Sequence, residues 1–306
     1  MIISINGNDV TKYVAKFSFE TSLDDVFSTV KFSLPFKYYV DKRITVFSKV
    51  EASSGGGAFE FKGKIINTEV DNVQRVNLTI VSNEFGLSSY EEMFKINKIS
   101  ATEAIEKVLS YYDGSITVDG FNMGTKITQF YKNDTIISII DDIISQHEGN
   151  IGQRIYRTFE NNVLYIFTDP KPYEVELKAR ISNLKLSYNG EDIKTKVKVY
   201  TEEKKKVSVI EEAENKSMVE KAGLIQKVHK IKAKEKNQAE LIAKNILTAY
   251  GSEKRTGSFD MLGDYNARIG SKVMLEDQRY IISGLKHTID DEIHLMKVEV
   301  LQYDKQ

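Results

Sequence analysis

The sequence predicts a mainly β protein with an α+β insertion, made of two related tube-type β-barrel domains and a small α+β middle module. Period-two alternation of apolar and polar residues dominates both ends of the chain, helical periodicity is confined to the interior, and the two ends repeat one strand pattern. We expect residues 1–88 to form the first barrel, 89–172 the α+β module, and 173–306 the second barrel with a helix near 237–250.

The repeat consists of a strand followed by a hairpin. It joins three stretches in each copy, which are 44–47, 61–66 and 75–81 in the first and 272–275, 281–287 and 295–301 in the second. A polar turn separates the last two stretches in both copies, and it is one residue shorter in the second. The copies match in pattern and not in identity. Such self-similarity predicts a duplicated structural unit.

The first barrel is predicted from short alternating strands. Asn6-Gly7 favours a tight hairpin turn at the start. Residues 16–20 and 30–34 alternate, and Pro35 stops the second of these runs. The glycines of 53–57 indicate a loop.

The middle module is predicted from two helices and a hairpin. Ser100 to Glu103 reads as a capping box before an apolar helix face. A second helix, rich in isoleucine, opens near Asn133. Asn161-Asn162 marks a hairpin turn, and the proline cluster at 169–172 marks the edge of the module.

The second barrel resumes the alternation around Asn189-Gly190. Residues 211–221 are polar, and we expect a long loop there. A strand over 224–231 follows, and then a helix from about Asn237 that Gly251 ends. We expect this helix to flank the second barrel.

The composition is that of an ordinary globular protein, with 41% hydrophobic and 28% charged residues among 306. Because cysteine is absent, disulfides, thiolate metal sites and thiol nucleophiles are excluded. The 43 basic and 44 acidic residues give no global attraction to nucleic acid or to a membrane. The N-terminus resembles no signal peptide, and the absence of cysteine fits synthesis and assembly in a cytoplasm.

Two groups of residues could carry chemistry. His287, His294 and the acidic turn 290–292 could ligate a metal, but their spacing matches no closed metal site, and a solvated turn is favoured. Asp141-Asp142 and His147-Glu148 could serve a hydrolase. Neighbouring helical residues diverge by about 100°, however, and a histidine suits the C-terminal end of a helix. We expect no catalytic residue, no metal and no cofactor.

Lysine-rich and aromatic stretches could in principle bind nucleic acid or sugar. The lysines of 204–206 and 230–236 are interleaved with glutamates and lack aromatic stacking partners, so solvated strand edges are favoured over nucleic-acid binding. Aromatic alternation at Phe17, Phe19 and Phe32 favours a barrel core over a sugar platform, since the chain has no tryptophan.

The order and spacing of both ends carry a family resemblance. The closing segment 239–301 runs helix, strand, a step with Gly263, Gly270 and Val273, and then a final hairpin. The opening segment has a short hairpin and then 19–35, in which Phe19-Glu20 leads through Asp24-Asp25 to Leu34-Pro35. The chain resembles the baseplate hub proteins of contractile-tailed phages and phage-tail-like bacteriocins, the group called XkdQ-like or late control D-like. The resemblance covers most of the chain and is weakest over 89–225.

The resemblance implies a structural, non-enzymatic role. A homotrimer would place six barrels in a pseudo-hexameric ring that joins the tail tube protein to a central spike protein and contacts other baseplate or wedge proteins. The protein would be a component of a virion or of a released tail-like particle, with no membrane partner and no specific binding of nucleic acid. The sequence ends after its last strand, so we expect a separate spike rather than the spike–hub fusion of secretion systems.

The two matched hairpins are the expected subunit or tube contacts, since unpaired barrel edges must be covered. The residues chosen are Gly63, Ile65, Val76, Leu78, Ile80, Gly284, Met296, Val298 and Val300. The alternative function is a cell-wall-directed tail-tip hydrolase or glycan-binding module.

Overall fold

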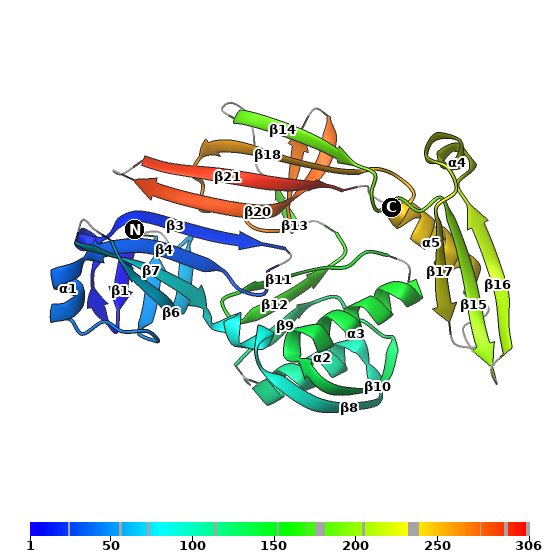
Figure 1. The fold of residues 1–306 in the computed structure, drawn as a ribbon, viewed down its shortest axis with the longest axis horizontal. Coiled ribbons are helices and arrows are strands. Elements are labelled where there is room, and N and C mark those ends of the chain that lie inside the picture. Colours follow the sequence, from blue (N-terminus) through cyan, green and yellow to red (C-terminus); the bar gives the residue numbers. More distant parts are fainter. Residues whose placement is uncertain are drawn as a thin grey trace.

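The computed structural model describes residues 1–303 except 24, 55–56, 72–73, 113–114, 152, 170, 175–180, 204–205, 232–238, 276 and 291–292. The fold is mainly β, as predicted, with four separate hydrophobic cores (Figure 1). The termini of the chain build two barrel units, and two smaller modules lie beside them. The domain boundaries drawn from the sequence remain a prediction.

The first barrel unit is a curved antiparallel sheet around its own core, with strand order β3-β4-β7-β6-β5-β1-β2. Its elements are β1 (Ile2–Ile5), β2 (Asn8–Asp9), η1 (Thr11–Tyr13), β3 (Ala15–Ser22), β4 (Thr29–Pro35), α1 (Phe36–Asp41), β5 (Lys49–Ser53), β6 (Glu60–Val70) and β7 (Arg75–Ser82). The Asn6-Gly7 turn is confirmed, with φ of 50° and 78°. The strand expected at 44–47 is wrong: Phe47 has φ 70°, which breaks an extended run, and β5 begins at Lys49.

The middle module packs two helices against two small sheets. Its elements are η2 (Asn83–Ser88), β8 (Glu91–Ser100), α2 (Ala101–Tyr112), β9 (Thr117–Gly120), β10 (Lys126–Thr135), α3 (Ile136–Ile151), β11 (Tyr156–Glu160) and β12 (Val163–Phe167). The capping box is confirmed, because Glu103 N donates to Ser100 Oγ while Ser100 N donates to the Glu103 carboxylate. The Asn161-Asn162 hairpin turn is also confirmed.

The second barrel unit has the strand order β14-β18-β21-β20-β19-β13. Its strands are β13 (Lys171–Glu174), β14 (Ser182–Asn189), β18 (Lys254–Leu262), β19 (Ser271–Leu275), β20 (Gln278–Asp290) and β21 (Ile293–Gln302). Its core gathers the inward residues of these strands, among them Phe259, Val298 and Val300.

An inserted module, between β14 and β18, has a core of its own. It comprises β15 (Lys196–Glu203), β16 (Lys206–Glu214), α4 (Lys216–Ala222), β17 (Gln226–Ile231) and α5 (Ala239–Tyr250). The long loop expected at 211–221 is wrong, since β16 continues to Glu214 and Asn215 caps α4 by accepting from Met218 N. Helix α5 packs on β15 and β16, because its buried residues Ile242 and Ala243 meet Val197 and Val199, and so it does not flank the second barrel.

The two barrel units share one strand plan. The order β3-β4-β7-β6-β5 in the first corresponds to β14-β18-β21-β20-β19 in the second, with every pair antiparallel. The irregularities agree as well. A bulge between β3 and β4 has its counterpart between β14 and β18, and one between β6 and β7 has its counterpart between β20 and β21. The plan differs at the margin, where β1 is antiparallel to β5 but β13 is parallel to β19.

Aligning the bulges gives one register for the whole repeat. Phe32, opposite Leu78, corresponds to Phe259, opposite Val298. Ile65, opposite Ile80, corresponds to Ile282, opposite Val300. The register therefore differs from the match by sequence pattern, because the residue of β6 equivalent to Gly284 is Asn67 and not Gly63.

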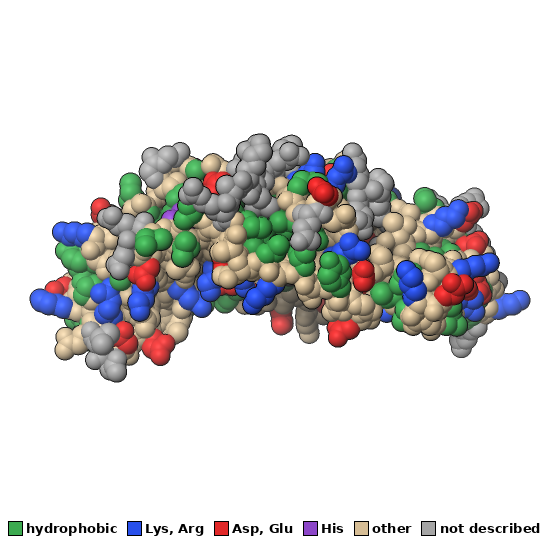
Figure 2. All heavy atoms as spheres, turned by 90° about the horizontal axis from the view of Figure 1, so that it is seen from above, with side chains coloured by type: hydrophobic (Ala, Val, Ile, Leu, Met, Phe, Trp, Pro, Cys, Tyr) green, Lys and Arg blue, Asp and Glu red, His purple; other side chains and the backbone are tan. Residues whose placement is uncertain are grey.

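The two barrel units form one continuous sheet, since β3 pairs with β20. In Figure 1 this sheet runs across the molecule from β14 to β6, with the middle module on one side and the inserted module at one end. Seen from above, the molecule is bowed along its length (Figure 2).

Candidate functional site

The pairing of β3 with β20, here called the seam, joins the barrel units. It has six antiparallel residue pairs, from Ser22 opposite Gly284 to Phe17 opposite Ile289. The middle of the seam alternates as a half-buried sheet does: Phe19 and His287 face the interior, and Glu20 and Lys286 face outward with an N–O distance of 3.7 Å. The seam thus fixes one barrel unit relative to the other through backbone hydrogen bonding.

The outward face of the continuous sheet, here called the polar face, spans both barrel units and is interrupted near the β20–β21 hairpin by the exposed apolar residues Leu262, Ile293 and Leu295. It carries small hydroxyl residues and paired charges, which are Ser18, Glu20, Thr29, Lys31, Thr79, Asp260, Lys286, Thr288, Lys297 and Glu299. Lys297 lies 3.3 Å from Glu299, both about half exposed. Charges of both signs lie on this face, in a row that reads Glu20, Lys286, Lys297 and Asp260, so it offers no single-sign field to a polyanion.

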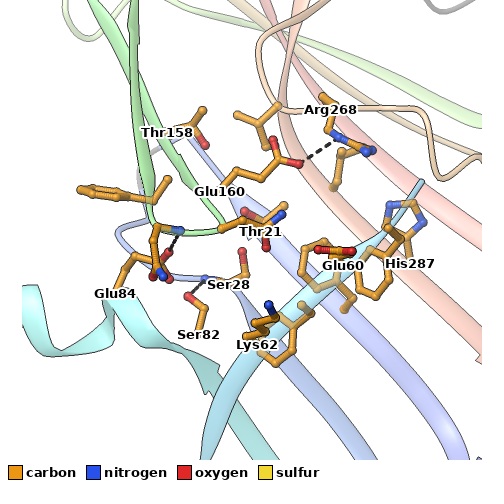
Figure 3. A pocket seen from close by; sticks show the side chains of 18 of the residues that line it. Thr21, Ser28, Glu60, Lys62, Ser82, Glu84, Thr158, Glu160, Arg268 and His287 are labelled. Atoms are coloured by element: carbon orange, nitrogen blue, oxygen red, sulfur yellow. Dashed lines mark hydrogen bonds and ion pairs between the residues drawn. The ribbon is translucent and has the colours of Figure 1, made fainter. Parts of the chain in front are cut away.

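A second contact region fixes both barrel units and the middle module to one another (Figure 3). The Arg268 guanidinium lies 3.0 Å from the Glu160 carboxylate of β11 and donates to the carbonyl oxygen of Ala58, just before β6. Nearby, Asn162 N donates to the buried Glu84 carboxylate at 2.8 Å. One arginine from the loop before β19 therefore ties three parts of the chain together, which we call the joint.

Gly270, in this loop, leaves no room for a side chain and has a left-handed backbone conformation. It has φ 78°, and a Cβ built on it would lie 2.5 Å from the Phe167 ring. Replacing Gly270 by alanine is expected to lower the free energy of unfolding by about 2–4 kcal/mol, through left-handed strain and overpacking. Thermal denaturation checks this. The matched control is Gly124→Ala, where nothing lies within 4 Å, and equal shifts for both variants would contradict the explanation.

Two histidines lie in contact at the seam, and of these His287 is buried while His294 is partly buried. His287 Nδ1 and His294 Nε2 are 2.9 Å apart, so one ring donates its proton to the other, and Tyr265 lies against both rings. Burial, followed by the proximity of His294 and of Arg268, lowers the pKa of His287 to about 4, while Asp264 acts weakly in the opposite direction. Burial also lowers the pKa of His294. As expected from the sequence, the two histidines lie on the two strands of a hairpin, and both rings face the core side; residues 291 and 292 of the turn lie outside the described residues.

The nine residues chosen from the sequence as subunit or tube contacts lie on β6, β7, β20 and β21. The side chains of Ile65, Val76, Leu78, Ile80, Met296, Val298 and Val300 are at most 1% exposed, inside the two barrel cores. Gly63 lies against Val81 of β7, and Gly284 lies in the seam beside Glu299. As subunit contacts these residues stay a prediction, and within one chain their side chains stabilise the barrels.

The four candidate residues of a hydrolase each have a structural partner. Asp141 forms a two-contact ion pair with Arg157, at 2.5 and 2.9 Å. Asp142 accepts from the Tyr131 hydroxyl, and His147 Nδ1 lies 2.6 Å from Thr125 Oγ1. Glu148 accepts from Ile155 N, and burial raises the pKa of its carboxyl group. These contacts hold α3 to β10 and β11, so the arrangement gives no pair of carboxylates facing a common substrate.

The described residues give little support to metal binding or to nucleic-acid binding. Within the described ranges, no group of three or more His, Cys, Asp or Glu side chains could hold a metal ion. Lys230 pairs with Glu202 at 2.6 Å, as expected for a solvated strand edge, whereas Lys204, Lys205 and 232–238 lie outside the described residues. Of the helices that the structure describes, none is long and apolar enough to cross a membrane.

The fold is shared with solved tail proteins. The tail protein from Neisseria meningitidis MC58 has a TM-score of 0.72 at 9% identity, covering 98% of this chain and 95% of that one. The 43 kDa tail protein of prophage MuSo2 from Shewanella oneidensis has 0.70 at 12%, covering 98% of both chains. The E. coli c3393 protein, a component of the type VI secretion system, has 0.60 at 10%, covering 99% of this chain and 77% of that one.

These likenesses define the class: the chain has the fold of phage tail proteins, and the resemblance drawn from the sequence is confirmed. A family model described as YQBQ-like matches residues 15–301, so the chain belongs to the YQBQ-like family. No curated protein is similar enough to count as a relative.

The sequence analysis missed the seam, the joint and the inserted module. The seam joins strands about 265 positions apart, and an alternating pattern does not say which strand is its neighbour. One signal for the inserted module was present: Asn215, followed by Ser217 and Met218, is a helix start inside the segment taken as a loop.

Proposed function

We propose that this chain is a non-enzymatic baseplate hub. Three copies form a ring of six similar barrel units that joins a tail tube to a central spike and contacts other baseplate or wedge proteins. The hub would be assembled in the bacterial cytoplasm and carried in a phage virion or a phage-tail-like bacteriocin. The ring, the contractile tail and the named partners are parts of the proposal.

One observation carries the proposal: the two barrel units repeat the same five-strand order with bulges at equivalent positions. A chain with two equivalent units can present six repeats to one neighbour and three to another, provided that copies associate around a closed axis. The likeness to tail proteins and to a secretion-system component supports a structural role in a tail.

The polar face suits the wall of a central channel. It spans both barrel units, and charges of opposite sign pair locally on it, as Glu20 does with Lys286. A wall with small hydroxyl groups and charges of both signs stays hydrated without holding a passing polyanion. The middle module lies on one side of this sheet and the inserted module at one end of it, where both can contact other baseplate proteins (Figure 1).

The seam and the joint suit a part that transmits force. Backbone pairing over six residue pairs fixes one unit to the other, and Arg268 fixes the middle module to both. The chain would therefore move as one piece within the ring.

Light scattering on the purified chain tests the ring. The expected mass is three times 34.9 kDa, with the monomer populated only on dilution. A mass of one or two chains at every concentration would overturn the proposal. Zymography on peptidoglycan tests the alternative, and a lytic band lost on Asp141→Asn or Glu148→Gln would favour the hydrolase.

A further inference from the structure

Strand β20 pairs with two strands along one edge. Its first part, Gln278 to Ile281, pairs with β19. Its later part, Gly284 to Ile289, pairs with β3 of the other barrel unit. The bulge between Ile282 and Gly284 separates the two parts. Strand β20 thus pairs first with a strand of its own barrel unit and then with the edge strand of the other barrel unit.

Strand β6 is the counterpart of β20, yet only the first part of this edge is paired. Residues Glu60 to Lys64 pair with β5, and the bulge follows Ile65. Beyond the bulge, β7 is the only strand partner of β6 within the described part of the chain. Val70 lies at the end of this open stretch with 57% of its side chain exposed, while its equivalent His287 is 3% exposed in the seam.

Strand β14 is the counterpart of β3, and it lies at the margin of the continuous sheet. It pairs with β18 on one side and with no described strand on the other. Two apolar residues of β14 are exposed, Tyr188 at 56% and Leu184 at 37%. The equivalent of Leu184 is Phe17, which pairs with Ile289 of β20 in the seam and is 3% exposed in the first barrel core.

The geometry points to a second copy of this chain as the occupant of both edges. We propose that β14 of one chain pairs antiparallel with the open stretch of β6 in the next, as β3 pairs with β20 inside each chain. This inference rests on the proposed ring. The equivalences place Asn189 opposite Asn67, Tyr188 opposite Thr68, Ser187 opposite Glu69, Leu186 opposite Val70, and Lys185 opposite Asp71.

The chemistry of these pairs fits the edges. Leu186 and Val70 both point to the core side, where they bury apolar surface, since their equivalents are Phe19 and His287. Lys185 meets Asp71 on the outward side, where the charges are opposite. Each chain also offers two different edges rather than one self-complementary edge, so the contact is head-to-tail, the kind of contact from which a closed ring is built. An exposed edge strand with apolar residues would otherwise promote aggregation.

Cysteine pairs test the register directly, because the chain has no cysteine of its own. Opposed strand residues have Cα atoms about 4.5–5.5 Å apart, which suits a disulfide. Mild oxidation of Leu186→Cys/Val70→Cys should link most of the protein into covalent dimers and trimers on a non-reducing gel. Each single variant should give at most one bond between two identical positions, and no trimer.

The matched control is Leu186→Cys/Thr68→Cys, two residues out of register. It should form at least tenfold less cross-linked trimer. A chain with trimeric mass that does not cross-link, or that cross-links equally in the control, would overturn this register and leave the proposed hub standing. A chain that stays monomeric at its highest soluble concentration would overturn both.

Discussion

Replacing Phe259 by alanine is expected to lower the free energy of unfolding by about 3–5 kcal/mol. Its ring is 1% exposed in the core of the second barrel unit, opposite Val298 of β21. Removing it leaves a cavity that the surrounding strands can fill only partly, because they are fixed in register on both sides. Urea denaturation of the variant and the parent chain measures the loss.

Phe32→Ala provides an internal comparison, since Phe32 is the equivalent residue of the first barrel unit and is 3% exposed. We expect a loss of similar size. Phe130→Ala, at a ring that is 51% exposed, is the surface control and should change stability by about 0.5 kcal/mol or less. Losses below about 1 kcal/mol at both buried positions would contradict the assignment of these rings to the two cores.

Acid is expected to destabilise the protein through His287. Its pKa is about 4 in the folded chain and about 6.5 in the unfolded chain, so between these values the unfolded state binds a proton that the folded state does not. The contribution of His287 to stability is therefore complete above about pH 7 and is lost as the pH falls toward 4. The expected loss is about 2 kcal/mol between pH 7.5 and 5, and about 3 kcal/mol near pH 4.

The measurement compares the pH dependence of urea denaturation in the parent chain and in His287→Gln. Glutamine does not titrate and can still hydrogen-bond to His294, so the difference between the two curves isolates His287 from the carboxylates. The groups that face His287 are His294 and Arg268, which lower its pKa, and Asp264, which raises it. Parallel curves for the two proteins would show that His287 does not carry this dependence.

Local elements were predicted correctly where all the residues that define them lie within one short stretch of the sequence. The Ser100–Glu103 box and the Asn161-Asn162 turn form as predicted because their hydrogen bonds join residues a few positions apart. Strands 16–20 and 30–34 were found from alternation, which reports that one face is buried. The strand placed at 44–47 failed because four apolar-rich residues do not distinguish a strand from a turn.

The contact surfaces between chains could not be identified from the sequence, because they depend on which distant strands pair. The nine contact residues were chosen for their matched pattern, and that pattern places most of their side chains in the barrel cores. Exposed residues such as Val70 and Tyr188 carry no signal of their own in the sequence. They become informative only when the register shows that their equivalents lie in the seam, where His287 is buried and Thr21 is partly buried.

The amino-acid sequence by itself determined the mainly β class, the repeat of one strand plan at the two ends and the helices of the middle module, because periodicity and capping are local properties. Only the tertiary structure decided that β3 pairs with β20, that bulges set the register of the repeat, and that β6 and β14 keep open edges. The physical reason is that a strand's hydrogen-bonding edge has the same backbone groups whatever its sequence, so the choice of neighbour depends on how the whole chain packs.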